Sequence, residues 1–160
     1  MSGRGTPATV ALTRAGMTFT VHEYVHAHRA DSYGAEAAAA LGVPPERVFK
    51  TLLADVDGRL TVAVVPVDAN LDLKALAAET GGKRATMADP DRAERATGYV
   101  RGGISPVGQR TRLPVVLDDS ALEHPTVYVS AGRRGLELEL EPDDLVAATG
   151  AAVARVRRAG

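Results

Sequence analysis

The sequence predicts a mixed α/β (α+β) fold, in which helices surround a mostly antiparallel, barrel-like sheet within a single domain spanning residues 1–160. The chain has 160 residues, of which 45% are hydrophobic and 24% charged, as one compact core requires. Helix and strand signals alternate at short intervals, without a repeat or a linker. The sequence combines a β-hairpin, whose strands are antiparallel, with strands that helices separate. The sheet should therefore be mixed rather than purely parallel.

The first elements are expected to be a helix, a strand and a second helix. The first helix covers 8–15, because Thr-Pro precedes it as N-cap and first-turn proline and a glycine follows it. Residues 18–25 alternate between apolar and polar side chains, as a strand does. Ser32 can cap the second helix, which contains four consecutive alanines and ends at Leu41-Gly42.

A β-hairpin follows. Residues 48–56 and 60–67 are apolar and rich in β-branched side chains. Asp57-Gly58 lies between them, and this pair favours the positive φ angles of a two-residue type I′ turn.

Caps and short apolar runs predict the remaining elements. In chain order they are a helix capped by Asn70 or Asp72, a strand at 83–87, a helix from 89 to 98, strands at 115–117, 126–129 and 136–140, a helix from 142 to 150, and an edge strand at 152–156.

Composition excludes several kinds of chemistry. Cysteine is absent, so the chain has no disulfide, thiolate metal site, iron–sulfur cluster or cysteine nucleophile of its own. The net charge of −1 argues against a surface that binds phosphates along its whole length, although a local basic patch is compatible with it. No apolar run reaches 18 residues and the first residues lack a signal-peptide pattern, so we expect a cytoplasmic protein.

A glycine-rich loop at 101–108 is the first candidate site. It holds three glycines and a proline in eight residues, between a helix and a strand. Such a backbone can approach a ligand closely and present N–H donors to a sugar or an oxyanion, whereas a plain connector is the alternative. The loop is neither a Walker motif nor GxSxG, since Val107 stands where the second glycine would be.

Five arginines lie in two loops and form the second candidate. They are Arg101, Arg110, Arg112, Arg133 and Arg134. If the fold brings both loops together, they would hold phosphates near a nucleic-acid end. A solvated basic turn is the alternative.

Lys50 is one of three lysines and lies at the start of an apolar strand, on the same face as Leu52. A lysine on the concave face of a sheet is costly to bury unless it meets an anion or a carbonyl group. The alternative is a lysine at the strand edge that reaches water.

Histidines and serines give weaker signals. His22, Tyr24, His26 and His28 share one face if their strand continues, which raises the possibility of zinc, but no carboxylate completes the site and we expect neither a metal nor another cofactor. Ser105 and Ser130 have no His/Asp partner in the sequence, so we expect hydrogen-bonding roles rather than a hydrolase triad.

Several segments together resemble a known family. Lys50 within VFKTLLADVDG, then LTVAVVPV, MADP, TGYVRGGISPVGQR and VYVSAGRRGLELEL, resemble bacterial Cys-tRNA(Pro) deacylases of the YbaK type in order and spacing. The resemblance runs nearly from end to end. This family is related to the editing domain inserted in bacterial prolyl-tRNA synthetases, whose fold the resemblance implies here.

The resemblance implies a trans-editing enzyme that hydrolyses misacylated Cys-tRNA(Pro), in which the substrate's own thiol attacks the ester carbonyl. It implies that Lys50 is catalytic and that the arginines above contact tRNA phosphates. The substrate-binding residues that it implies are Tyr24, Tyr33, Thr51, Gly102, Gly103, Ile104, Ser105, Pro106, Ser130 and Glu137. Glu137 stands where many relatives have aspartate, so its carboxylate reaches one methylene further.

The implied partners are the aminoacylated CCA end of tRNA and prolyl-tRNA synthetase. Two alternatives stay open. One is a deacylase for another misacylated tRNA, such as alanine on proline tRNA, and the other is a non-catalytic module that binds tRNA or a synthetase.

Overall fold

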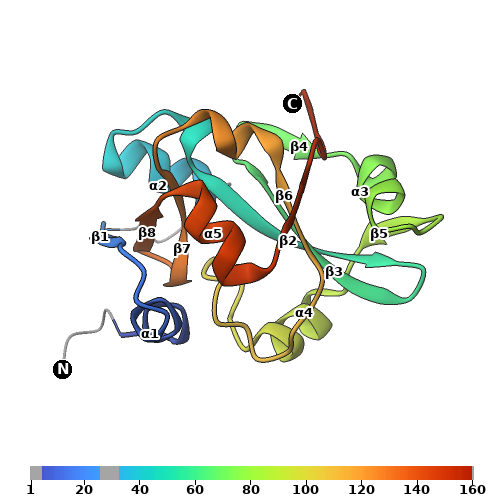
Figure 1. Ribbon diagram of the computed structural model, residues 1–160, viewed down its shortest axis with the longest axis horizontal. Helices are drawn as coiled ribbons and strands as arrows, with labels where there is room; N and C mark the ends of the chain where they lie inside the picture. The colour runs from blue at the N-terminus through green and yellow to red at the C-terminus, as the bar shows by residue number, and fades with distance from the viewer. Residues whose placement is uncertain (1–4, 26–32, 160) are drawn as a thin grey trace.

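A mixed five-stranded sheet forms the centre of the protein in the computed structural model, which describes residues 5–25 and 33–159 (Figure 1). Its strand order is β5-β2-β3-β6-β9. The strands are β2 (Phe49–Val56), β3 (Arg59–Pro66), β5 (Ala85–Met87), β6 (Val115–Asp118) and β9 (Ala152–Ala154). β2 pairs antiparallel with β3 and β5, whereas β3–β6 and β6–β9 are parallel, which confirms the predicted mixture.

Two smaller sheets complete the β-structure. One is antiparallel with the order β1-β8-β7, and the other joins β4 to β10. Their strands are β1 (Thr20–Glu23), β7 (Val127–Arg133), β8 (Leu136–Leu140), β4 (Ala69–Leu71) and β10 (Arg157–Ala159). A parallel bridge between Val48 and Tyr128 links the first of these sheets to the start of β2. The described strands thus belong to three sheets and do not close into one barrel.

Helices pack around the sheets, as expected (Figure 1). They are α1 (Pro7–Arg14), α2 (Tyr33–Leu41), α3 (Leu73–Glu79), α4 (Pro90–Thr97) and α5 (Pro142–Thr149), with 3-10 turns η1 (Pro45–Arg47) and η2 (Asp119–Glu123). Asp72, rather than Asn70, caps α3, because its carboxylate accepts the Ala75 amide proton at 3.0 Å. Asn70 lies in β4 instead. The proposed cap Ser32 lies outside the described residues.

The hairpin turn has the predicted type. Asp57 and Gly58 have φ angles of 52° and 92°, so both central residues are left-handed, as type I′ requires. The Asp57 carboxylate also accepts the amide protons of Lys83 and Arg84 at 2.8 and 3.0 Å. This turn therefore also fixes the chain that leads into β5.

Strand β2 separates two apolar cores and has one incompletely paired edge. Phe49 and Leu53 contribute to the core beneath β7 and β8, whereas Ala54 and Val56 pack with Leu76 of α3 on the other face. β3 covers one edge of β2 throughout, but β5 pairs with the other edge only at 54–56. The edge at 49–53 is consequently left without a strand partner.

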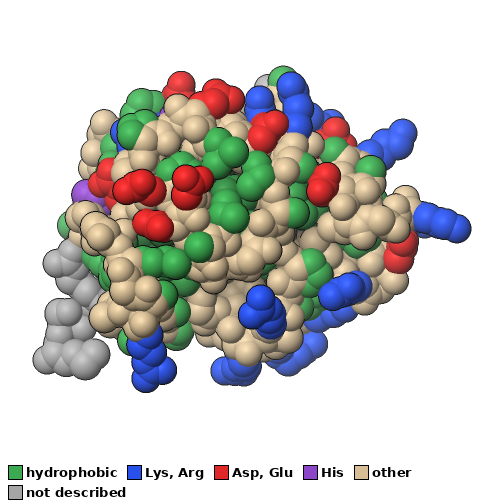
Figure 2. Space-filling model, viewed as in Figure 1, with side chains coloured by type: hydrophobic (Ala, Val, Ile, Leu, Met, Phe, Trp, Pro, Cys, Tyr) green, Lys and Arg blue, Asp and Glu red, His purple; other side chains and the backbone are tan. Residues whose placement is uncertain are grey.

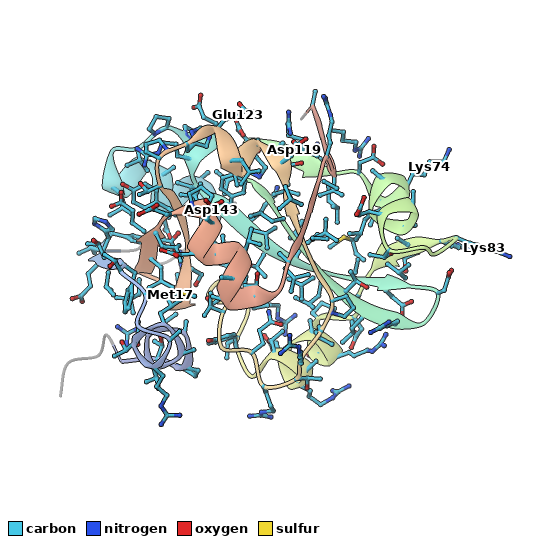
Figure 3. All side chains as sticks on the ribbon, in the orientation of Figure 1. Met17, Lys74, Lys83, Asp119, Glu123 and Asp143 are labelled. Carbon is cyan, nitrogen blue, oxygen red and sulfur yellow. The ribbon has the colours of Figure 1, made fainter. Side chains whose placement is uncertain are left out.

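Charged side chains are distributed unevenly over the surface. On the face in Figure 2, acidic side chains gather at the upper left, around α5 and η2, and basic side chains line the lower edge around α4. Lys74 and Lys83 are exposed and extend outward at the right-hand end (Figure 3). None of the helices in the described part of the chain is both long and apolar enough to span a membrane.

Candidate functional site

A pocket of about 370 Å³ opens at the unpaired edge of β2. β2 forms one wall, and the ends of β7 and β8, the start of α2, the loop after α4 and the start of α4 form the others. Nine of the residues singled out in the sequence line it: Tyr24, Tyr33, Lys50, Thr51, Arg101, Gly102, Ile104, Ser130 and Glu137. Residues from five distant segments of the chain therefore meet in one cavity.

Lys50 brings a cation to this pocket. It is half-buried on β2, opposite Val65 of β3. Desolvation lowers the pKa of its ammonium group, and the nearby Asp68 carboxylate opposes that shift. Among the described residues, no hydrogen bond or ion pair to the Lys50 ammonium is found. The group is thus available to an oxygen atom of a ligand.

Glu137 brings a buried carboxyl group. It is 6% exposed and pairs in register with Ser130 on β7 and His22 on β1. Burial raises its pKa to about 8, so the carboxyl group is largely protonated at neutral pH. No cation of the described residues forms an ion pair with it. A cationic ligand group could therefore pair with it and favour its ionised form.

Thr51 supplies an unpaired hydroxyl group. Its Oγ1 is buried and lacks a hydrogen-bond partner within the described part of the chain. A buried polar atom without a partner costs about 1–3 kcal/mol, a cost that a bound polar atom would remove. Tyr24 lies in the same pocket, where burial, followed by the Glu137 charge, raises the pKa of its phenol.

The glycine-rich loop contributes to the pocket through Gly102 and Ile104 only. Gly103 packs against the β7 end, where an added Cβ would lie 2.6 Å from Arg133 Cα. Ser105 is fully buried, and its Oγ accepts the Val107 amide proton at 3.2 Å. Pro106 is buried as well and does not line the cavity. These three residues shape the loop rather than touch the contents of the pocket.

The five arginines do not form one cluster. Arg101 lines the pocket, and its Nε donates to Glu94 at 3.1 Å. Arg133 lies beside Gly103, and the next residue, Arg134, is bound by Glu36.

Arg110 and Arg112 lie near Gly98 and Gly150, and Arg110 shares a surface hollow with Glu94, the partner of Arg101. Both of these glycines are left-handed C-caps, of α4 and α5 respectively. Cations are favourable near a helix C-terminus, which gives these two arginines a structural role. Neither arginine lines the pocket, so the hypothesis that both contact tRNA phosphates stays a prediction.

The histidine pattern does not form a metal site in the described residues. His22 Nε2 lies 2.8 Å from Glu139 Oε1, and its ring lies 5.5 Å from the Tyr128 ring. His26 and His28 lie outside the described residues. Elsewhere in the described chain, no three His, Asp or Glu side chains are arranged to hold a metal ion.

Sequence reasoning missed the apolar half of the pocket. Phe49 and Leu53 come from β2, Met87 ends β5 and Ala88 follows it, and Ala93 lies on α4. Their apolar character was visible, but it indicated core positions. Only the short pairing of β5 with β2 leaves a cavity beside them.

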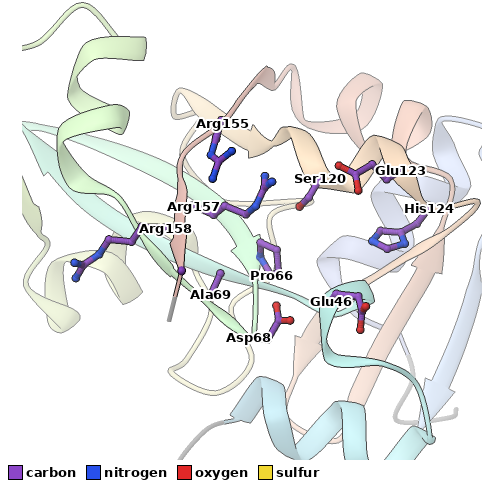
Figure 4. Close-up of a pocket in the computed structure, with 11 residues that line it drawn as sticks. Glu46, Pro66, Asp68, Ala69, Ser120, Glu123, His124, Arg155, Arg157 and Arg158 are labelled. Atoms are coloured by element: carbon purple, nitrogen blue, oxygen red, sulfur yellow. The ribbon is translucent and has the colours of Figure 1, made fainter.

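A second hollow, of about 430 Å³, lies between η2 and β10 (Figure 4). Arginines and acidic residues line it in equal number: Arg155, Arg157, Arg158, Glu46, Asp68 and Glu123. Arg157 is also held by Asp118 at 2.7 Å and Asp119 at 2.8 Å. This hollow therefore has no excess of positive charge for an anion.

Comparisons with known proteins agree on one family. Residues 27–148 match the family model described as "Aminoacyl-tRNA editing domain". A candidate Cys-tRNA(Pro)/Cys-tRNA(Cys) deacylase, EbsC of Enterococcus faecalis, is 38% identical over 84% of this chain and 83% of its own length. The proline–tRNA ligase of Moorella thermoacetica is 39% identical over 65% of this chain, which corresponds to 18% of the ligase.

A solved structure agrees with these sequence matches. The crystal structure of a candidate trans-editing enzyme for prolyl-tRNA synthetase superimposes with a TM-score of 0.86 and 29% identity, covering 99% of both chains. This match confirms the mixed α+β fold expected from the sequence.

Proposed function

The chain belongs to the aminoacyl-tRNA editing domain family, and we propose that it acts in trans as a deacylase that removes cysteine wrongly attached to proline tRNA. One observation carries this proposal. A single cavity holds an available ammonium group, a buried carboxyl group without a cation and an unpaired hydroxyl group, and the chain has no cysteine to act as nucleophile. The name of the Enterococcus faecalis relative supports the choice of substrate.

Glu137 binds the α-ammonium group of the aminoacyl ester. A buried carboxyl group without a cation is costly to ionise, and a substrate ammonium within hydrogen-bond reach offsets that cost. Ser130 faces the same space as its register partner, because paired residues of adjacent strands point to one side of the sheet. Thr51 Oγ1 offers a further hydrogen bond to the side chain of the aminoacyl group.

Lys50 stabilises the negative charge that develops on the ester. Its ammonium has no ion-pair partner in the described residues, so it can approach the carbonyl or ribose oxygen. The backbone of Gly102 and Ile104 lines the same cavity and can add N–H donors. Preorganised donors aimed at a developing oxyanion contribute about 10²–10³ in rate each.

The substrate supplies the nucleophile. Its thiol sulfur forms a bond to the ester carbonyl carbon, and the bond from that carbon to the ribose oxygen breaks. The thiol proton passes to the departing ribose oxygen, so the products are a cysteine thiolactone and tRNA with a free 3′ end. The protein contributes orientation and charge stabilisation, which suits a chain without cysteine.

The CCA end enters beside Arg101 and Arg133, which lie at the pocket and next to its loop. The CCA sequence is common to all tRNAs, so these contacts do not identify proline tRNA. We infer that prolyl-tRNA synthetase is the partner that supplies the selected tRNA, and that both act in the cytoplasm. Docking of this kind raises the local substrate concentration without new contacts to the tRNA.

The substrate test compares cysteinyl-, alanyl- and seryl-tRNA(Pro) at equal concentration, with product analysis for the thiolactone. We expect cysteinyl-tRNA to be deacylated fastest and the thiolactone to be released. Faster loss of alanine would contradict the thiol mechanism and favour the alternative deacylase. No acceleration of any ester over its spontaneous hydrolysis would favour a binding module.

The partner test compares cysteinyl-tRNA(Pro) with cysteinyl-tRNA(Cys), each with and without prolyl-tRNA synthetase. The isolated protein is expected to accept both, and the synthetase should accelerate only the proline tRNA reaction. A strong intrinsic preference that the synthetase does not change would contradict the inferred partnership.

A further inference from the structure

Arg134 is held by protein groups, although its sequence context pointed to tRNA phosphates. It lies in the turn between β7 and β8, and its Nε and Nη2 donate to the two carboxylate oxygens of Glu36 on α2, both at 3.0 Å. The two side chains are 20% and 11% exposed. This is a two-pronged, largely buried ion pair, which ties α2 to the β7–β8 turn.

The same guanidinium group also stacks on an aromatic ring. Arg134 Cζ lies 4.9 Å from the ring centroid of Tyr33. Tyr33 precedes Glu36 by three residues, so both lie on one side of α2 and meet the same arginine. A planar guanidinium can pair with a carboxylate and stack on a ring at once, whereas a lysine ammonium cannot.

Two glycines of the pocket loop rest against this unit. Gly102 has a φ of +89°, and an added Cβ would lie 3.3 Å from two atoms of the Tyr33 ring. Gly103 lies against the backbone of Arg133, the neighbour of Arg134. The loop backbone therefore packs against the Tyr33 ring and against the β7–β8 turn. The Glu36–Arg134 pair joins α2, which carries Tyr33, to this turn.

We propose that Arg134 is a positioning residue: together with Glu36 it fixes Tyr33 and the β7–β8 turn, and through them it holds the Gly102–Ile104 backbone in place at the pocket. Its effect on the reaction rests on the proposed deacylase function, in which the Gly102 and Ile104 amides of this backbone donate to the developing oxyanion. A displacement of such donors by about 1 Å can cost up to 10²-fold in rate. Arg134 thus acts on kcat through the loop and not on tRNA affinity through phosphates.

The charge-conserving variant Arg134→Lys separates these two roles. A phosphate contact needs a positive charge, which lysine keeps, whereas the two-pronged pair and the ring stacking need the guanidinium. Glu36→Gln weakens the same pair from α2 without changing any basic residue. Arg155→Ala, which removes an exposed arginine remote from this pocket, is the matched control.

Three readouts are measured on all variants: kcat and KM for cysteinyl-tRNA(Pro), the salt dependence of KM, and hydrogen exchange of the amides of residues 102–104. Arg134→Lys and Glu36→Gln should each lower kcat about tenfold and accelerate exchange at the loop about tenfold. KM and its salt dependence should be unchanged, because no phosphate contact is lost. The control should match the wild type in all three readouts.

Unchanged loop exchange in both variants would overturn the proposal. Arg134→Ala is measured as well, because it removes the positive charge. Normal kcat in Arg134→Lys, together with a raised KM and a weaker salt dependence in Arg134→Ala, would show a phosphate contact and contradict the positioning role. If the wild type does not deacylate any aminoacyl-tRNA, the proposed function fails, while loop exchange still decides the positioning role. Thermal unfolding verifies that each variant is folded. If Arg134→Lys does not fold, kcat and loop exchange of Glu36→Gln decide the proposal.

Discussion

Ser130 on β7 and Glu137 on β8 are register partners, so a hydroxyl group and a buried carboxyl group enter the pocket next to each other. Ser130 Oγ accepts the Gly132 amide proton at 3.1 Å, and Glu137 forms no ion pair within the described residues. One pair of adjacent strand positions thus contributes two of the polar groups that line the pocket.

Glu137 should make the protein less stable as pH rises. Its pKa is about 8 in the folded chain, above the ordinary value of 4.5, so the folded state binds more protons between these values. The free energy of unfolding therefore falls as pH rises through this window, by on the order of a few kcal/mol. Urea unfolding from pH 5 to 9 measures it, and Glu137→Gln should flatten the dependence. An equally steep decline in that variant would assign the pH dependence of the free energy of unfolding to other groups.

Lys50→Ala should lower kcat for deacylation by about 10²-fold or more and leave the fold intact, because it removes the cation that stabilises the oxyanion. Burial of an ammonium is itself costly, so thermal stability should be unchanged or slightly raised. Lys74→Ala removes an exposed lysine on α3 and serves as control. Near-normal activity of Lys50→Ala would remove Lys50 from the mechanism.

Thr51→Val should separate substrate binding from stability. Valine has nearly the same shape as threonine and removes a hydroxyl group that has no partner, so the free energy of unfolding should rise by up to about 1 kcal/mol. Deacylation of cysteinyl-tRNA should nevertheless become slower, since the bound aminoacyl group loses a hydrogen bond. Thr51→Ser keeps the hydroxyl and should keep the rate. Equal deacylation rates for Thr51→Val and the wild type would show that Thr51 does not contact the substrate.

Gly103→Val should damage turnover by displacing the loop. An added Cβ would lie 2.6 Å from Arg133 Cα, a backbone atom that cannot move aside as a flexible side chain would. We expect a loss of stability of about 1–3 kcal/mol, as for other overpacked sites, together with a fall in kcat. Gly103→Ala should show the same effects at smaller size. Full activity in both variants would mean that the loop is only a connector.

Asp118→Asn should destabilise the C-terminal segment. The buried Asp118 carboxylate accepts from Ser120 Oγ at 2.6 Å, from Arg157 Nη1 at 2.7 Å and from the amide groups of Val156 and Arg157. Burial raises its pKa, but these hydrogen bonds together outweigh burial and lower it.

A lowered pKa stabilises the fold above the unfolded-state pKa, and this contribution is lost as pH falls through the folded-state value. Asp118→Asn should cost about 1–3 kcal/mol at pH 7, because the hydrogen bonds from Ser120, Val156 and Arg157 lose their charged acceptor while Arg157 keeps only Asp119, and less in acid. Urea titrations at pH 7 and pH 3 measure the difference. A cost that is the same at both values would contradict the role of the charge.

Local structure was largely determined by the sequence, because it depends on residues close together in the chain. Asp57-Gly58 forms the type I′ turn that its backbone preferences require. Asp89 and Gly98 bound α4 as N-cap and left-handed C-cap. By contrast β4 and β10, each of three residues, were missed, since so short a strand is stabilised by its partner rather than by its own alternation.

The site was determined in part by the sequence and in part only by the tertiary structure. The residue types and motif order of Lys50, Glu137 and the glycine loop indicated which side chains matter, because the chemistry depends on their functional groups. Which arginines are available could not be read from the chain, since Glu36 and Glu94 reach Arg134 and Arg101 only in the folded protein. The cavity itself exists because β5 pairs with just the end of β2, and the length of a strand pairing is set by packing far along the chain.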